Sequence, residues 1–172
     1  MKKFLLAVGA ALAALALGGC ASYDGRGLVP GSSTGPQVEA LMGKPALRLP
    51  AADGGSVLYF PRSPLGRHTF AVTLGPDGVM RAIDQRLTHA NIDKLRAGTS
   101  NRKDVLGIFG PPDPANISRM PFKPLEVWEY RWLESGDKRI LWVSFSDDGI
   151  LREVINTHDY EADEPTGSGS MP

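Results

Sequence analysis

The apolar residues of this 172-residue chain recur with a helical period in two short stretches, 31–45 and 98–112. In each stretch, three apolar side chains stand at positions i, i+3 and i+4, which places them on one face of a helix. They are Val38, Leu41 and Met42 in the first stretch and Val105, Ile108 and Phe109 in the second. A single shift of 67 positions pairs these residues, which indicates an internal repeat. Each stretch therefore predicts a short helix with one narrow buried face.

The residues around these apolar positions predict where each helix begins and ends. Gly31 and Gly98 precede hydroxyl side chains, whose oxygens can accept hydrogen bonds from the first free N–H groups of a helix. Thr34 and Gln37 have the spacing of a capping box. A glycine and then a proline, at 43 and 45 and again at 110 and 112, end the helix. The first Gly-x-x-x-Gly has no Lys-Ser/Thr after it, so a phosphate-binding loop is excluded.

Alternating apolar and polar residues predict three strands after each helix. The first set covers 56–60, 69–74 and 79–83, and the second covers 126–133, 139–145 and 150–155. Asp-Gly pairs at 77–78 and 148–149 predict hairpin turns, and a shift of 71 aligns the two hairpins. We expect loops at 46–55 and in the proline-rich segment 111–125, and a short helix over 88–97 capped by Thr88.

These elements predict an α+β fold of two tandem units, each a helix-helix pair packed on a three-stranded antiparallel sheet. The first unit covers residues 31–87 and the second covers 88–158. Residues 20–30 are expected to form a tether, and residues 159–172 a disordered acidic Gly/Ser tail. Strand alternation predicts the inward side chains of the two sheets. They are Leu58, Phe60, Phe70, Val72, Leu74, Val79 and Ile83, and Trp128, Tyr130, Trp132, Leu141, Val143, Phe145, Ile150 and Val154.

The opposite face of the second sheet is mixed in character and holds one large aromatic side chain, Trp142. The same alternation assigns Glu129, Arg131, Ile140, Trp142, Ser144, Leu151 and Glu153 to it. One interpretation makes Trp142 a partner-binding anchor with Glu129, Arg131 and Glu153 as its polar rim. In a second, the segment 111–125 folds back and covers Trp142. In a third, the strand register is wrong by one residue, which would exchange the two faces.

The N-terminal residues 1–19 read as a secretory signal peptide, with Lys2 and Lys3 before an apolar stretch too short to span a membrane. The stretch ends in Leu-Gly-Gly-Cys, which resembles a bacterial lipobox. Cys20 is the only cysteine, and lipid modification explains both its position at the end of the apolar stretch and the absence of a second cysteine. The alternative is an ordinary signal peptide with a coincidental cysteine. By resemblance to Gram-negative sorting rules, Ala21 after Cys20 favours the outer membrane, where several acyl chains on Cys20 give stable anchoring.

The net charge of the chain does not favour any particular class of partner. Without Lys2 and Lys3 the remaining chain has 17 basic and 19 acidic residues, so it carries no strong field of one sign. This balance argues against a nucleic-acid partner. An exported chain with one cysteine has no internal disulfide, so its stability must come from an apolar core.

Residues 92–155 contain a specific set of motifs: Gly98-Thr99, Val105, Gly110-Pro111-Pro112, Trp128-Glu129-Tyr130 and the run from Phe145 to Gly149. This set resembles the SmpA/OmlA (BamE-like) lipoprotein family. In the first copy Leu58-Tyr59-Phe60 replaces the Trp-containing strand. Two such units in tandem resemble the β-lactamase-inhibitor-protein (BLIP-like) architecture. The resemblance implies a protein that binds proteins or lipids, in part through a concave sheet face, without catalysis. It carries no partner-binding residue over to this chain.

The sequence offers no catalytic or metal-binding constellation. His68, His89 and His158 have neither metal-ligand spacing nor a cysteine near them. Asp147-Asp148-Gly149 reads as a hairpin turn, because a calcium loop needs more widely spaced oxygens. No nucleophile motif of the Gly-x-Ser-x-Gly or Ser-x-x-Lys kind is present. We expect no cofactor, no metal and no enzymatic activity.

Two functional hypotheses remain. The first is a periplasm-facing outer-membrane lipoprotein that acts as a protein-binding assembly or scaffolding factor for an envelope protein. The second is an envelope module for a small ligand, a lipid or peptidoglycan. A large apolar cavity between helices and sheet would favour the second hypothesis. A filled core with an aromatic side chain on the open sheet face would favour the first.

Overall fold

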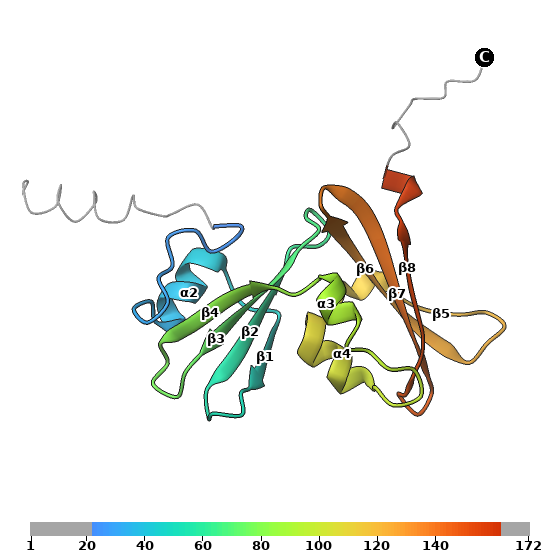
Figure 1. The fold of residues 1–172 in the computed structure, drawn as a ribbon, viewed down its shortest axis with the longest axis horizontal. Coiled ribbons are helices and arrows are strands. Elements are labelled where there is room, and N and C mark those ends of the chain that lie inside the picture. Colours follow the sequence, from blue (N-terminus) through green and yellow to red (C-terminus); the bar gives the residue numbers. More distant parts are fainter. Residues whose placement is uncertain (1–21, 163–172) are drawn as a thin grey trace, which may run out of the picture.

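The computed structural model describes residues 22–162. The predicted signal peptide, Cys20 and residues 163–172 of the predicted tail lie outside this range. The described chain forms two four-stranded antiparallel sheets, with the strands of each sheet in sequence order (Figure 1). The strands are β1 (Leu47–Pro50), β2 (Ser56–Pro61), β3 (Thr69–Leu74), β4 (Met80–Gln85), β5 (Ile117–Arg119), β6 (Leu125–Glu134), β7 (Asp137–Ser146) and β8 (Leu151–His158). The helices are α2 (Gly35–Met42), α3 (His89–Ile92) and α4 (Arg102–Phe109), with 3₁₀ turns η1 (Pro114–Asn116) and η2 (Tyr160–Ala162).

The predicted fold class, helix-helix pairs on three-stranded sheets, is wrong. Each sheet has a fourth strand at its edge, and within residues 22–162 the first unit has one helix, so the described part is mostly β. β1 lies in a segment predicted as loop because it contains Pro50, but proline is tolerated on an edge strand. β5 has only three residues and follows three prolines, so no alternation could reveal it. The helix expected over 88–97 is the four-residue α3, and Thr88 does cap it.

The two longer helices confirm the repeat in detail. α2 and α4 have eight residues each and begin 67 positions apart. Thr34 and Asn101 are their N-caps, each within a capping box, and each also forms an isolated bridge to the start of the third predicted strand. The helices end at Gly43 and Gly110, which have φ angles of 89° and 79°. Glycine is required at both positions because residues that carry a side chain rarely adopt a positive φ.

The core assignment is confirmed for most strands and wrong at one repeated position. Val38 and Met42 pack on the first sheet, and Val105 and Phe109 pack on the second. Met80 and Leu151, however, are fully buried where Val79 and Ile150 were predicted, so Leu151 does not lie on the outer face. The register shifts between Thr73 and Leu74, and again between Ser144 and Phe145. Such a bulge adds one residue to a strand and exchanges the faces beyond it.

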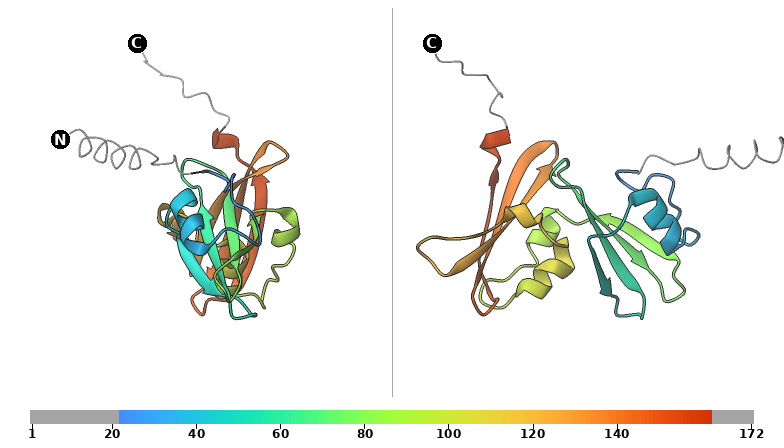
Figure 2. Two further views of the ribbon diagram at one scale, coloured as in Figure 1. Left: turned by 90° about the vertical axis from the view of Figure 1, so that its left-hand side faces the viewer. Right: turned by 180° about the vertical axis from the view of Figure 1, so that it is seen from behind.

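The elements stack in the order α2, first sheet, α3 with α4, second sheet (Figures 1 and 2). α4 therefore contacts both sheets. The Tyr59 hydroxyl of β2 donates to the Gly107 carbonyl oxygen at 2.5 Å, and the Tyr130 hydroxyl of β6 donates to the Gly110 carbonyl oxygen at 3.0 Å. Burial raises the pKa of both tyrosines, so both hydroxyls remain protonated donors. This order leaves the outer face of the second sheet without a covering helix.

The first described residues lie against the first unit. The Ser22 N–H donates to the Leu41 carbonyl oxygen at 2.6 Å. Arg62 donates through Nε to the Tyr23 carbonyl oxygen at 2.7 Å and through Nη2 to that of Ser22 at 3.2 Å. The part of the predicted tether that the structure describes is thus fixed to the folded body from Ser22 onward.

Candidate functional site

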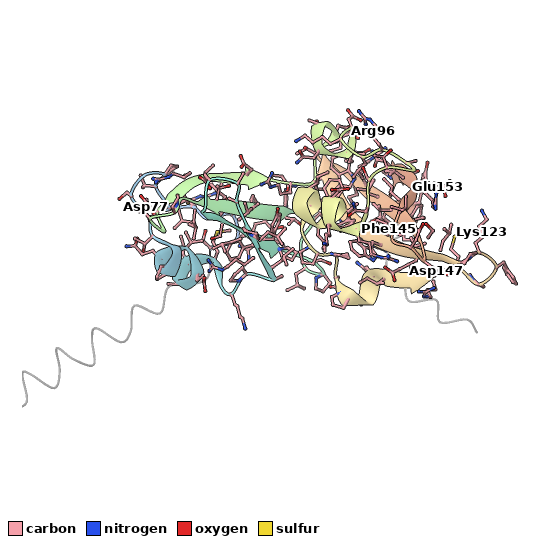
Figure 3. The ribbon with its side chains drawn as sticks, turned by 90° about the horizontal axis from the view of Figure 1, so that it is seen from below. Asp77, Arg96, Lys123, Phe145, Asp147 and Glu153 are labelled. Atoms are coloured by element: carbon pink, nitrogen blue, oxygen red, sulfur yellow. The ribbon has the colours of Figure 1, made fainter. Side chains whose placement is uncertain are left out.

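The outer face of the second sheet collects the side chains that strand alternation assigned to it, except Leu151. Glu129 of β6 is paired with Trp142 of β7, which is paired in turn with Ile155 of β8. Ser144 is paired with Glu153 in the next rung. The faces predicted for the side chains of β6 and β7 are therefore confirmed, and the alternative of a one-residue error is excluded for these two strands. In Figure 3, Phe145 lies near the helices and Glu153 lies at the outer side of the sheet.

A hollow of about 370 Å³ opens on this face beside Trp142. Val127 and Ile155 form apolar walls on the sheet. Met120 and Pro121, which follow β5, form a further wall. Segment 111–125 therefore lines the hollow but leaves Trp142 half-buried, so the full cover considered from the sequence does not form. Met120 and Ile155 are exposed beside it.

A polar network holds the indole of Trp142. Its Nε1–H donates to Glu129 Oε2 at 3.0 Å, and Arg131 Nε donates to Glu129 Oε1 at 2.8 Å. The hydrogen bond to the Glu129 carboxylate, followed by that to Glu161, raises the pKa of Arg131. Arg131 also reaches Asp159, whose side chain is fully buried, at 3.4 Å. Glu129 and Arg131 thus fix the orientation of Trp142 and have little freedom to serve as a loose rim.

Glu153 differs from the other two predicted rim residues. It is exposed at the wall of the hollow, and its side chain has no hydrogen bond or ion pair with any other residue in the range 22–162. Its carboxylate is therefore available to a cationic group from outside. Of the four predicted partner-binding residues, Trp142 and Glu153 line the hollow. Glu129 and Arg131 do not line it: Glu129 accepts from the indole of Trp142, and Arg131 donates to Glu129.

Sequence reasoning missed three apolar members of the hollow: Met120, Val127 and Ile155. Ile155 stands two residues after Glu153, so the alternation that placed Glu153 on the outer face could also have placed Ile155 there. Met120 stands in a proline-rich segment with no periodicity. Val127 alternates with Trp128 and Glu129, so the same counting that placed Glu129 could have found it.

A second hollow, of about 280 Å³, lies where the β2–β3 loop meets the second sheet, with Arg67 and Arg131 in its lining. Arg67 Nη2 donates to Asp159 Oδ2 at 2.6 Å. The arginines there are already paired with carboxylates, so the charge of this hollow is balanced. The contact joins the two units.

The histidines lie in three separate places in the described chain. Tyr23 contacts His68, Glu134 contacts His89, and Asp137 contacts His158. No group of three or more His, Cys, Asp or Glu side chains among the described residues is arranged to hold a metal ion. Within residues 22–162, no helix is both long and apolar enough to cross a bilayer.

Comparisons of the chain with protein-family models, with curated proteins and with solved structures return no match. The resemblance to SmpA/OmlA lipoproteins rests on the motifs of residues 92–155 and remains a prediction.

Proposed function

We propose that the protein is a lipid-anchored outer-membrane lipoprotein that binds another envelope protein as a non-enzymatic assembly or scaffolding factor. Cys20 is the anchoring residue in this proposal, on the lipobox evidence. The outer face of the second sheet, around Trp142, is the binding surface. The observation that carries the proposal is the open apolar hollow beside an immobilised Trp142 and an unpaired Glu153.

The chemistry of the hollow suits an apolar anchor side chain from a partner. Tryptophan is enriched among residues that dominate binding energy, particularly where its environment excludes water. The hydrogen bond to Glu129 already satisfies the indole N–H, so a partner can cover Trp142 without leaving that donor unpaired. Glu153 beside the hollow favours a lysine or arginine next to the anchor. We therefore expect the partner to present an apolar side chain flanked by a basic one.

The internal repeat supports the same surface. The 71-residue shift makes Ala71 equivalent to Trp142, and their cross-strand neighbours are Tyr59 and Glu129. Tyr59 and Ala71 are buried, and the end of α4 contacts Tyr59. The first sheet thus receives a short helix on the face that the second sheet leaves open. A partner that adds a comparable element to the second sheet would extend the existing order of layers.

Site-specific photo-cross-linking tests the proposal. A benzophenone side chain is introduced at Ile155, inside the hollow, and the acylated full-length protein is produced in its native cells. It is expected to cross-link to a defined envelope protein. The same group at Lys44, which is exposed beside α2, serves as the control and should not capture that protein. Equal capture from both positions, or none from Ile155, would contradict the assignment of the binding face.

The volume of the hollow also falls within the range of about 300–1,000 Å³ typical of small-molecule sites. A small ligand, a lipid or a peptidoglycan fragment is therefore the second candidate occupant. In the same experiment this alternative predicts that the Ile155 adduct gains only a small mass and contains no second polypeptide.

A further inference from the structure

The chain between the proposed anchor and the folded body is very short. Ser22 is held by the Leu41 carbonyl oxygen at 2.6 Å and by Arg62 at 3.2 Å. Only one residue separates Ser22 from Cys20. A fully extended chain spans at most about 3.6 Å per residue, so the Cα atoms of Cys20 and Ser22 are no more than about 7 Å apart. A lipid on Cys20 would bring this corner of the body to the membrane surface.

The surface at this corner carries exposed apolar side chains. Tyr23 is 45% exposed, and Leu65, in the loop between β2 and β3, is 99% exposed. Contacts hold the loop to the first described residues: Arg62 reaches the Tyr23 carbonyl oxygen at 2.7 Å, and the Tyr23 hydroxyl lies 3.0 Å from His68 Nδ1. Gly66, next to Leu65, also packs against the Tyr23 ring. Ser22, Tyr23 and Leu65 therefore form one fixed surface, which we call the anchor patch.

A third exposed apolar side chain lies along the same edge of the molecule. Tyr160, in η2, is 73% exposed. Figures 1 and 2 show the start of the described chain, the β2–β3 loop and η2 all at the upper edge, although they belong to different units. A rotation about the vertical axis does not change the height of any segment, so all three segments lie at a similar level of the molecule.

We propose that this edge rests on the membrane, with Leu65 and Tyr23 in the phospholipid interface and Tyr160 close to it. The inference depends on the anchor at Cys20 in the function proposed above. The polar layer on each side of a bilayer is roughly 5–8 Å thick, comparable with the reach from Cys20 to Ser22. Tyrosine is favoured at that depth, because an apolar ring that carries a polar hydroxyl suits the boundary between headgroups and acyl chains. The partner surface is therefore phospholipid.

This orientation has a consequence for the binding face. The strands of the second sheet run from the upper edge downward, and its outer face points sideways (Figure 1). With the upper edge on the membrane, the hollow beside Trp142 faces along the membrane plane. A partner that is itself embedded in or attached to the same membrane would meet this face.

A tryptophan introduced at Leu65 measures the contact. The acylated full-length protein would be reconstituted in phosphatidylcholine vesicles, with or without brominated acyl chains that quench nearby indoles. Leu65→Trp is expected to show added fluorescence that shifts to shorter wavelength and is lost with brominated lipid. Phe122→Trp is the matched control, since Phe122 is 98% exposed and lies at the end of the β5–β6 hairpin. Its added fluorescence should remain, after subtraction of the three native tryptophans.

Flotation of the vesicles separates the failure of this inference from the failure of the anchor. If the parent protein floats with the vesicles but Leu65→Trp is quenched no more than Phe122→Trp, the anchor stands and the anchor patch is wrong. If the parent protein does not float, both proposals fail. Selective quenching at Leu65 that disappears together with flotation in Cys20→Ser supports both.

Discussion

At the scale of single residues, the junction between the units depends on Gly110. It ends α4 with a φ of 79°, and a Cβ at this position would lie 2.8 Å from Tyr59 Cδ1. The Gly110 carbonyl oxygen accepts from Tyr130 on the other side. Gly110 therefore lies between one tyrosine from each sheet, and its lack of a side chain lets α4 contact both.

Gly110→Ala should lower the free energy of unfolding more than the same change at a comparable glycine. The backbone of Gly110, with φ of 79° and ψ of −176°, lies in a region that is almost restricted to glycine and costs alanine about 1–3 kcal/mol. Forcing Tyr59 aside adds about 1–3 kcal/mol more. Gly43→Ala is the matched control, because Gly43 ends α2 with a φ of 89° and a ψ of −174° but would place its Cβ in open space. Urea denaturation measures both variants. Equal losses of stability in the two variants would show that the close contact between position 110 and the Tyr59 ring adds no cost.

At the scale of elements, each longer helix places one buried face on its own sheet. Val105 and Phe109 of α4 are completely buried against Trp128, Tyr130 and Phe145. The bulge is a repeated element as well, because Arg81 and Arg152 occupy equivalent positions in the two hairpins. They pair with Asp77 at 2.7 Å and with Asp148 at 3.4 Å. The turn and the bulge thus recur together.

Val105→Asp should unfold or severely destabilise the second unit. The aspartate would be an unpaired charge in the apolar core, with a cost of several kcal/mol. Lys103→Asp is the control on the same helix, because Lys103 is exposed and the change should leave the melting temperature nearly unaltered. A Val105→Asp protein that melts like the parent would contradict the core assignment.

Local patterns in the sequence were sufficient to predict the helix faces and their caps, since these contacts join near neighbours: the Gln37 side chain accepts from the Thr34 N–H, and the Thr88 hydroxyl accepts from the Asn91 N–H. They also predicted that Trp142 lies on the outer face of the second sheet, because this assignment requires only the alternation of side chains within β7. They could not predict β1 or β5, whose pairing depends on β2 and β6 rather than on their own few residues. The bulges were missed for the same reason, because Met80 and Leu151 are placed by the partner strand. The hollow was missed since Met120 reaches it only through the β5–β6 pairing.

At the scale of the whole molecule, the order of layers relates the proposed anchor to the proposed binding face. The first unit holds Ser22, near the proposed anchor, and its sheet receives α4. The second unit places its uncovered face at the opposite end of the molecule (Figure 1). The contact of Tyr59 with α4 and the ion pair of Arg67 with Asp159 join the units.

Cys20→Ser should release the body into soluble envelope fractions or leave the signal peptide uncleaved, because no acyl chain can then be attached. Fractionation with detection of the mature and precursor sizes measures this. A mature-sized mutant that fractionates with the outer membrane as the parent does would contradict the lipid anchor.

The central claim is that the outer face around Trp142 binds a partner, and Trp142→Ala tests it most directly when affinity and stability are measured on the same preparation. The free energy of binding to the protein that cross-links at position 155 should weaken by about 2 kcal/mol or more, as for other tryptophan hot spots. The free energy of unfolding should fall by less than about 2 kcal/mol, because Trp142 is only half-buried. Trp142→Phe, which retains an aromatic ring, should keep most of the affinity. A loss of stability of roughly 3–5 kcal/mol with unchanged affinity in the folded protein would show that Trp142 is a packing residue.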